Sequence, residues 1–290
     1  MSTTKQVNYV DVIKDIEQFY VDNNIVVNAL ITTTSLKYKP LSVEQLKGFI
    51  ELQISTAKDE FGVLTGLQAV DMLNDIIVNN SLDHKEKLLT SLSVLDRDAI
   101  LLQLRAHVKP GVELAITGSE DNETQSVDLT EITSRIKKAK FPKTLKERSK
   151  ALKFNGGTFT VKLKLPSLQV DSDVNNKFRG LVLPKLSKGA KHVEKHVDKI
   201  LSQVYFLELY KYIDTVTINK KDEDETVVNF RDLDNFDQNF LLLDKLPTQI
   251  IANISEYMTD VRKYKDGIFY YENDNKQIPL DVDIGLFAGI

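Results

Sequence analysis

The sequence contains no cysteine and no tryptophan among its 290 residues, and it has only 12 glycines. The absence of cysteine excludes disulfide bonds, thiolate catalysis, iron–sulfur clusters and cysteine-ligated zinc. The scarcity of glycine disfavours phosphate-binding loops, and neither G-x-x-x-x-G-K-[ST] nor G-x-G-x-x-G occurs. No uncharged apolar stretch approaches the roughly 18 residues of a membrane span, and the first residues lack the apolar core of a secretory signal. We therefore expect a cytoplasmic protein.

Charge is distributed unevenly along a chain whose net charge is only −4. Residues 1–134 carry 11 basic and 20 acidic residues, residues 135–199 carry 18 and 5, and residues 200–290 carry 9 and 17. A basic middle between two acidic parts is not typical of a nucleic-acid-binding domain, in which positive charge dominates. We expect the basic segment either to pack against the acidic parts of the same chain or to bind an acidic partner.

Residues 8–22 have the apolar spacing of an amphipathic helix, and Ile13, Ile16 and Tyr20 belong to its apolar stripe. A single helix of this length is only marginally stable in water, so the stripe needs a surface that covers it. Packing against the neighbouring lobe is the simpler expectation. The alternative is that the helix docks into a groove of a partner, with these three side chains as anchors.

The patterns after this helix predict an α+β fold of two mixed lobes, each with helices and short β-hairpins, joined by a basic connector. The connector is the strongest boundary because residues 135–153 hold nine basic residues and one acidic residue. Its side chains expected to contact an acidic partner are Lys137, Lys138, Lys140 and Lys143. The predicted domains are the N-terminal amphipathic helix at 1–24, the first α+β lobe at 25–134, the basic connector at 135–155 and the second α+β lobe at 156–290.

Local patterns place elements within each lobe. β-Branched residues predict one or two strands within 25–39, and Ser42 with Gln45 forms a capping box that predicts a helix reaching about residue 57. Alternation of apolar and polar residues predicts a strand over 158–165. The other expected elements are helices at 64–79, from 93 or 96 to 105, and at 188–212, 232–244 and 248–264, with hairpins at 112–117 and 126–129 and at 216–218 and 226–230, and extended segments at 268–271 and 277–282.

Candidate catalytic and metal-binding residues are few. His192 and His196 lie four residues apart, a spacing at which one helix face can present two metal ligands. Val193 follows the first histidine where the zinc-protease motif has its catalytic glutamate, and no third ligand is marked. No G-x-S-x-G motif indicates a nucleophile. The sequence therefore predicts a protein that is not an enzyme, with no catalytic residue, metal or cofactor.

The order of features from Leu36 to Leu129 resembles that of a known family. The features are Tyr38-Lys39-Pro40-Leu41-Ser42-Val43-Glu44-Gln45, two helical patterns, Leu95-Asp96-Arg97-Asp98-Ala99-Ile100-Leu101-Leu102-Gln103-Leu104-Arg105-Ala106, Gly111 and Val127-Asp128-Leu129. This order is similar to that of the baseplate proteins of T-even-type phages with contractile tails, typified by the hub subunit and the hub assembly factor. Further similarities extend the resemblance to residues 36–290, namely 183–186, 210–213, 246–247, 278–281 and 286–287.

The resemblance has one chemical departure, in the loop of the first hairpin. Many relatives have cysteine pairs there, whereas residues 118–125 of this sequence read GSEDNETQ. Thiolates are the soft ligands of such metal clips, so a metal role of the loop does not carry over to this chain. The helix at 8–22 also lies outside the family pattern.

The resemblance implies a structural or assembly component of a phage tail baseplate that docks with hub, tube or wedge proteins. It implies the host cytoplasm during assembly and leaves open whether the protein then stays in the virion. The alternative function is a cytoplasmic accessory or loader protein that associates with nucleic acid through residues 135–199. Phe141 and Phe154 are the only rings near the basic connector on which bases could stack, so nucleic-acid binding is the less favoured function.

Overall fold

The computed structural model describes residues 8–32, 34–56, 63–83, 85–115, 124–186, 197–221 and 223–288, which form an α+β fold. The helices are α1 (Tyr9–Asp22), α2 (Val43–Thr56), α3 (Val63–Asn79), α4 (Lys85–Ser91), α5 (Val94–Val108), α6 (Leu129–Lys138), α7 (Lys143–Lys146), α8 (Leu168–Leu186), α10 (Val197–Tyr212), η1 (Leu233–Asn235), α11 (Phe236–Leu243), α12 (Thr248–Asp266) and α13 (Gly285–Ala288). The strands are β1 (Ile25–Asn28), β2 (Ser35–Tyr38), β3 (Gly111–Ala115), β4 (Thr124–Asp128), β5 (Glu147–Phe154), β6 (Gly157–Lys164), β7 (Ile213–Lys220), β8 (Thr226–Asn229), β9 (Tyr270–Asn273) and β10 (Lys276–Pro279).

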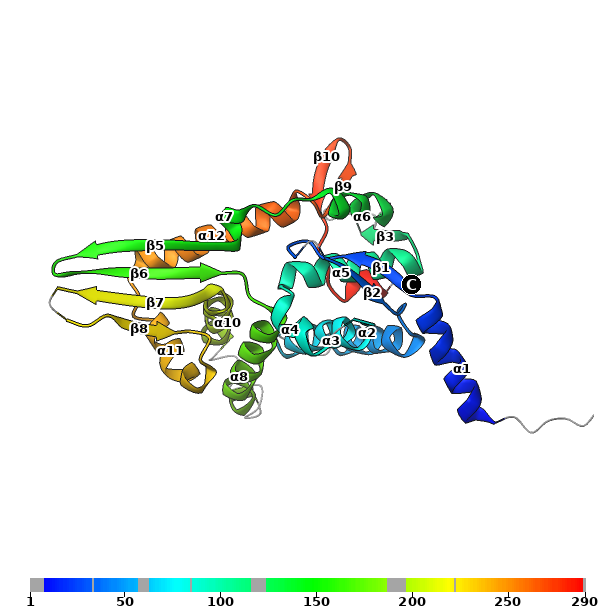
Figure 1. Cartoon of the computed structure of the whole chain (residues 1–290), viewed down its shortest axis with the longest axis horizontal. Coiled ribbons are helices and arrows are strands. Elements are labelled where there is room, and N and C mark those ends of the chain that lie inside the picture. Colours follow the sequence, from blue (N-terminus) through cyan, green and yellow to red (C-terminus); the bar gives the residue numbers. More distant parts are fainter. Residues whose placement is uncertain are drawn as a thin grey trace, which may run out of the picture.

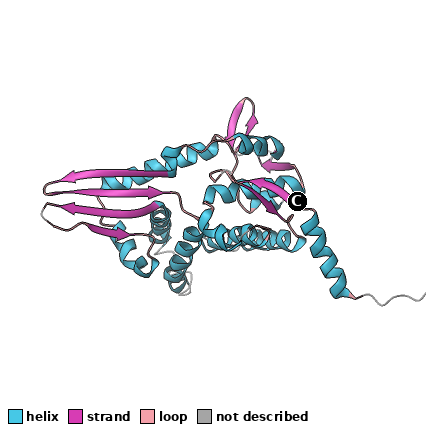
Figure 2. Cartoon of the chain, viewed as in Figure 1, coloured by secondary structure: helices cyan, strands magenta, loops and turns pink. Residues whose placement is uncertain are grey.

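The molecule is elongated, with its largest sheet at one end and the helix α1 at the other (Figure 1). The sheet is antiparallel in the order β5-β6-β7-β8, while β1–β2, β3–β4 and β9–β10 form separate two-stranded hairpins. Helices α10, α11 and α12 lie beside the large sheet, and α2 to α5 form the helical part nearer α1, as the labels of Figure 1 and the same view in Figure 2 show. No helix in the described ranges is both long enough and apolar enough to cross a bilayer.

One face of the large sheet is covered and the other is open. On the covered face, Val161 and Leu163 of β6 are buried beside apolar residues of α12 such as Ile254 and Tyr257. The intervening residues of β6, Thr160 and Lys162 among them, point to the opposite face because side chains alternate along a strand. This alternation explains why the sequence pattern predicted a half-buried strand here.

Helix α5 is the most deeply buried helix of the half that carries α1. Its start is fixed by a capping box in which the Asp96 amide donates to Ser93 Oγ over 3.2 Å and Asp96 Oδ2 accepts from the Ser93 amide over 3.0 Å. The other oxygen, Asp96 Oδ1, accepts from the Ile31 amide over 2.7 Å and so ties the helix to the chain after β1. Gln103 further along the helix donates to the Asn28 carbonyl over 2.9 Å, which holds β1 against the helix.

Elements late in the sequence complete this half. The rings of Phe49 in α2 and Phe287 in α13 stack with centroids 4.4 Å apart at an interplanar angle of 13°. Arg105 of α5 donates from Nε to the Leu286 carbonyl over 2.8 Å. Arg135 of α6 donates to the Ile268 carbonyl over 3.0 Å. The residues after α12 therefore pack with the first lobe, so the expected second lobe at 156–290 is not a separately packed unit along its whole length.

Most expected elements are confirmed, including α1, the Ser42–Gln45 capping box and each hairpin. The main correction concerns the expected connector at 135–155. Its residues form the end of α6, the short α7 and the whole of β5, which pairs with β6 along eight residues. The density of lysines in this segment led to the wrong prediction of a linker, because an edge strand with one solvent-exposed face tolerates lysines as easily as a linker does.

The helices that the sequence did not predict are α4, α6, α7, α8 and α13. Helix α8 begins soon after Pro166 and has no wide apolar stripe, because charged residues such as Asp171 lie on its buried side. The helix expected at 188–212 is described only as α10, and residues 187–196, including His192 and His196, lie outside the described residues. His84 also lies outside them, and His107 is exposed at the end of α5.

Candidate functional site

Both ends of helix α1 are capped by residues next to the helix. Asn8 caps its start, since Asn8 Oδ1 accepts from the Val10 amide over 3.1 Å and Asn8 Nδ2 donates to Asp11 over 2.8 Å. Asn23 closes the end, where its amide and its side chain both donate to the Phe19 carbonyl. These local bonds satisfy backbone groups at both ends without help from the rest of the molecule.

The apolar stripe of α1 is left in solvent. No residue of the helix is buried, and Ile13, Ile16 and Phe19 are 57%, 51% and 61% exposed. Tyr20 is half-buried and meets Phe19 edge-on at 6.1 Å. The expectation that the stripe packs against the first lobe is therefore wrong, and the helix projects from the end of the molecule (Figure 1). Burying the three expected anchors Ile13, Ile16 and Tyr20 would contribute roughly 4–9 kcal/mol before ordering costs.

The four lysines expected to bind an acidic partner are exposed. Lys137 and Lys138 lie at the end of α6, and Lys140 and Lys143 lie just before and at the start of α7. None of the four forms an ion pair with any described residue. Helix α6 turns Leu129, Ile132 and Ile136 inward, so its lysines face outward as the amphipathic pattern requires.

Arginines of the same basic segment behave differently. Arg135 lies 3.9 Å from the centroid of the Tyr270 ring, and Arg148 pairs with Asp260 of α12 at 2.7 Å. Arg179 of α8 pairs with Asp71 of α3. The guanidinium group is weakly hydrated and forms planar hydrogen bonds, which suits it to these internal contacts. The expected packing of the basic segment against acidic parts of the chain therefore holds for its arginines and not for these four lysines.

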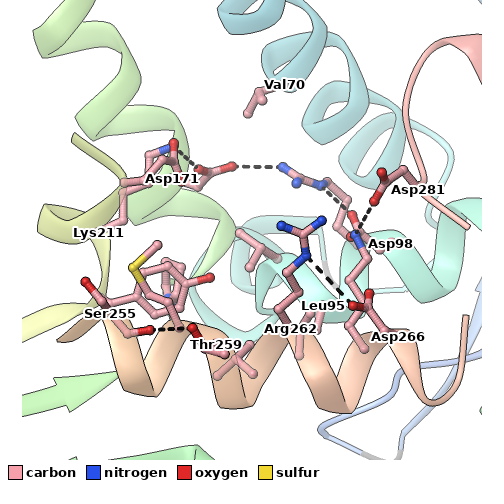
Figure 3. A pocket seen from close by; sticks show the side chains of 18 of the residues that line it. Val70, Leu95, Asp98, Asp171, Lys211, Ser255, Thr259, Arg262, Asp266 and Asp281 are labelled. Carbon is pink, nitrogen blue, oxygen red and sulfur yellow. Dashed lines mark hydrogen bonds and ion pairs between the residues drawn. The ribbon is translucent and has the colours of Figure 1, made fainter. Parts of the chain in front are cut away.

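A cleft of about 630 Å³ lies between α5, α8, α10 and α12, and charged groups line it (Figure 3). Asp171 of α8 is at its centre, 2.8 Å from Arg97 Nη1 of α5 and 2.8 Å from Lys211 Nζ of α10. Lys211 also pairs with Glu208 at 2.6 Å. The network thus joins three helices that come from both halves of the chain.

A second part of the network reaches α12. Arg97 Nε lies 3.4 Å from Asp98, and Lys265 of α12 lies 3.1 Å from the other oxygen of Asp98. Lys265 also faces Asp281 at 3.8 Å, as the dashed lines of Figure 3 show. The side chains of Arg97 and Asp98 have little exposure, so water screens these pairs weakly.

The electrostatics of the cleft are internally balanced. Burial alone would raise the pKa of Asp171, but Lys211 and Arg97 outweigh burial and hold that pKa below its ordinary value. Burial would likewise lower the pKa of Lys211, and the facing Asp171 and Glu208 raise it instead. Asp171 and Lys211 are therefore both charged and form an ion pair with each other over the physiological pH range.

Three hydroxyl groups of the cleft, those of Thr259, Ser255 and Tyr205, form hydrogen bonds of their own. Thr259 Oγ1 donates to the Ser255 carbonyl over 2.8 Å, and Ser255 Oγ lies 2.9 Å from the Tyr205 hydroxyl. In the described part of the chain, no three histidine or acidic side chains gather to hold a metal ion. The arrangement is that of a structural network which fixes four helices, and it gives no nucleophile paired with a base.

Sequence reasoning missed this cleft because isolated charged residues within helical patterns resemble solvent-exposed ones. One signal was present in Tyr210-Lys211-Tyr212-Ile213, where a lysine lies among apolar residues that the helical period places in the core. Its partner Asp171 is 40 residues away, and Arg97, which pairs with the same carboxylate, is farther still, so no local pattern could connect them.

Comparison with known proteins gives no relative. Neither a protein family, nor a curated protein, nor a solved structure matches this chain. The similarity to contractile-tail baseplate proteins therefore stays a prediction from the order of residues in the sequence.

Proposed function

We propose that this protein is a non-enzymatic component of a contractile phage tail baseplate, either a hub subunit or a hub assembly factor, which acts by docking to other tail proteins. The main support for a docking role is the exposure of α1, a helix with caps at both ends whose apolar stripe has no buried residue. A stable protein does not leave such a stripe in water unless another surface covers it. The resemblance of residues 36–290 to baseplate proteins supplies the biological setting, which is assembly in the host cytoplasm.

The chemistry of α1 defines the groove that it would enter. Its polar residues Asp11, Asp15, Glu17 and Asp22 outnumber the single lysine, Lys14. A helix that presents i, i+3 and i+7 apolar side chains between acidic flanks suits an apolar groove with a basic rim. We propose that hub, tube or wedge proteins of the same tail provide this groove.

The decisive experiment replaces apolar residues of α1 and follows both folding and assembly. The variant Ile13→Asp with Ile16→Asp should keep the wild-type melting temperature and should fail to copurify with coexpressed hub, tube and wedge proteins. The control variant Lys14→Gln with Glu17→Gln changes two exposed polar residues of the same helix and should copurify normally. A fall of many degrees in the melting temperature, or normal copurification of the aspartate variant, contradicts the proposal. Mass spectrometry of purified particles distinguishes a hub subunit, which stays, from an assembly factor, which leaves.

The second candidate is an accessory or loader protein that binds nucleic acid through residues 135–199. It is supported by the four exposed lysines without ion pairs in the described residues. Titration with duplex DNA over a range of salt concentrations tests it, because phosphate binding by several lysines gives an affinity that falls steeply with salt. Absence of binding at low salt excludes this candidate.

A further inference from the structure

Strand β5 is a free edge of the large sheet. It is the first strand in the order β5-β6-β7-β8 and pairs on one side only. Opposed residues of antiparallel strands share backbone hydrogen bonds at every second pair. The Lys221 amide donates to the Gly156 carbonyl, so the hydrogen-bonded pairs between β6 and β7 fall at the even-numbered residues of β6. The backbone groups of the odd-numbered residues of β6 therefore face β5. By the register of β5 with β6, the backbone groups of Ser149, Ala151 and Lys153 then point away from the sheet.

These outward groups have no internal cover. Ser149, Ala151 and Lys153 are all exposed. Helix α12 lies against the face of the sheet, where Arg148 pairs with Asp260 and lies 5.2 Å from the Tyr257 ring centroid, and not against the edge. Outside the sheet ladder, no backbone hydrogen bond within the described residues involves Ser149, Ala151 or Lys153. The edge therefore offers an uninterrupted row of alternating donors and acceptors.

The charge along this edge is positive. Lys150 and Lys153 are exposed and have no ion pair with a described residue, while the strand's one acid, Glu147, pairs with Lys162 at 3.3 Å. The strand continues the line of exposed lysines from α6 and α7, and the three elements follow one another along one side of the molecule (Figure 1). Two copies of β5 would bring like charges together, so this edge does not favour self-pairing.

An apolar hollow of about 440 Å³ lies at the tip of the same strand. Leu152, Phe154 and Phe159 line it together with Pro247, and Phe154 is 44% exposed. Leu152 and Phe159 are directly opposite each other in the sheet, so the hollow lies on the helix-covered face. An added strand would direct every second side chain to that face and could place one apolar side chain beside Phe154.

From these features we propose that β5 binds an extended acidic segment of another protein as a fifth strand of the sheet, with one apolar side chain of that segment in the hollow. A peptide backbone matches both the donors and the acceptors of the edge, and acidic side chains match its lysines. Nucleic acid does not fit as well, because phosphates accept hydrogen bonds and leave the outward carbonyls unmatched. This surface is separate from α1, so its failure would leave the proposed docking role of α1 untouched.

The competing explanation is that the lysines protect the edge from pairing with any strand, as they do in many sheets. Peptide probes distinguish the two. The first probe is an eight-residue fluorescent peptide of alternating valine and glutamate, as long as β5. The second has lysine in place of glutamate, and the third is the glutamate peptide with alternate backbone amides N-methylated. Binding is measured by fluorescence anisotropy, and protection of single amides by NMR hydrogen exchange.

We expect saturable binding of the glutamate peptide, with protection of the Ser149, Ala151 and Lys153 amides, and at least about tenfold weaker binding of the other two peptides. In the protein, Ala151→Pro removes one outward amide at an edge position that tolerates proline and should weaken binding about fivefold or more. Lys150→Glu with Lys153→Glu should weaken it similarly, whereas the control Ser149→Ala keeps every backbone group and should bind normally. Equal binding of the N-methylated peptide, unchanged binding by Ala151→Pro, or no binding of the glutamate peptide overturns the proposal.

Discussion

Lys211 and Asp171 form an ion pair of 2.8 Å inside the protein, and each side chain is only 5% exposed. The pair connects α10 to α8, and Arg97 connects the same carboxylate to α5. Both cations share this carboxylate in low-dielectric surroundings, so its removal leaves each of them with less compensating charge. This set joins helices from both halves of the chain.

We expect Asp171→Asn to lower the free energy of unfolding by about 3–5 kcal/mol, because Lys211 and Arg97 lose their shared counter-ion. Urea denaturation followed by circular dichroism measures the change. Asp224→Asn, in an exposed loop, is the matched control and should have an effect within about 0.5 kcal/mol. Equal stability of the two variants would show that the network contributes little.

The same carboxylate gives a pH dependence. The pKa of Asp171 is lowered in the folded state by Lys211 and Arg97, whose attraction outweighs the opposing effect of burial. A group of this kind stabilises the fold above its unfolded pKa of about 3.9, and the contribution is lost as pH falls through the lower folded value. Carbon-13 NMR titration of the Asp171 carboxyl should therefore give a midpoint below about 3.9. A midpoint above that value contradicts the assignment of the ion pairs.

The four lysines between α6 and α7 should matter for binding and not for folding. Changing Lys137, Lys138, Lys140 and Lys143 to glutamate should alter the free energy of unfolding by no more than about 1 kcal/mol, since none pairs with a described residue. Copurification with tail proteins should weaken, and more at low salt than at high salt. Arg148→Glu serves as the contrast, because it breaks the pair with Asp260 and should destabilise the fold. Unchanged copurification at both salt concentrations would mean that these lysines are exposed side chains which do not contribute to binding.

Arg105 should not be replaceable by lysine. Its side chain is fully buried, donates from Nε to the Leu286 carbonyl over 2.8 Å and also donates to the Lys109 carbonyl, and burial lowers its pKa. A lysine amine cannot reproduce this planar set of donors, so Arg105→Lys should cost about 1–3 kcal/mol of stability in urea denaturation. Arg262→Lys, at a side chain that is 75% exposed, is the control and should be neutral. Equal stability of the two variants would indicate that the carbonyls find other donors.

The sequence predicted features that local periodicity and capping determine. The recurrence of apolar residues every three or four positions over 8–22 predicted α1, and the capping box of Ser42 with Gln45 predicted the start of α2. Alternation over 158–165 predicted β6 because one face of that strand packs and the other meets solvent. Periodicity and capping depend on residues that are close in the sequence, so they predict these elements without any knowledge of distant contacts.

Features that depend on distant contacts were not predictable. The lysines of β5 resemble a linker until β6 is seen beside them, and Asp171 resembles a surface acid until Arg97 and Lys211 are placed around it. Whether the stripe of α1 would be covered was also undetermined, since covering it requires a complementary surface elsewhere in the molecule. Among the candidate sites, the sequence therefore singled out the helix and the lysines, whose role in binding stays a prediction, but not the free strand or the charged cleft.

The stacking of Phe49 on Phe287 has a consequence for synthesis of the protein. Helix α5 and Leu286 are joined by a hydrogen bond between residues 181 positions apart, so the ribosome makes α2 and α5 long before the residues that cover them. The half that carries α1 thus exposes part of its core through most of translation and closes only when residues 286 and 287 emerge. Nascent chains would be vulnerable to aggregation or proteolysis during that interval, and chains truncated before Leu286 would retain the vulnerability permanently.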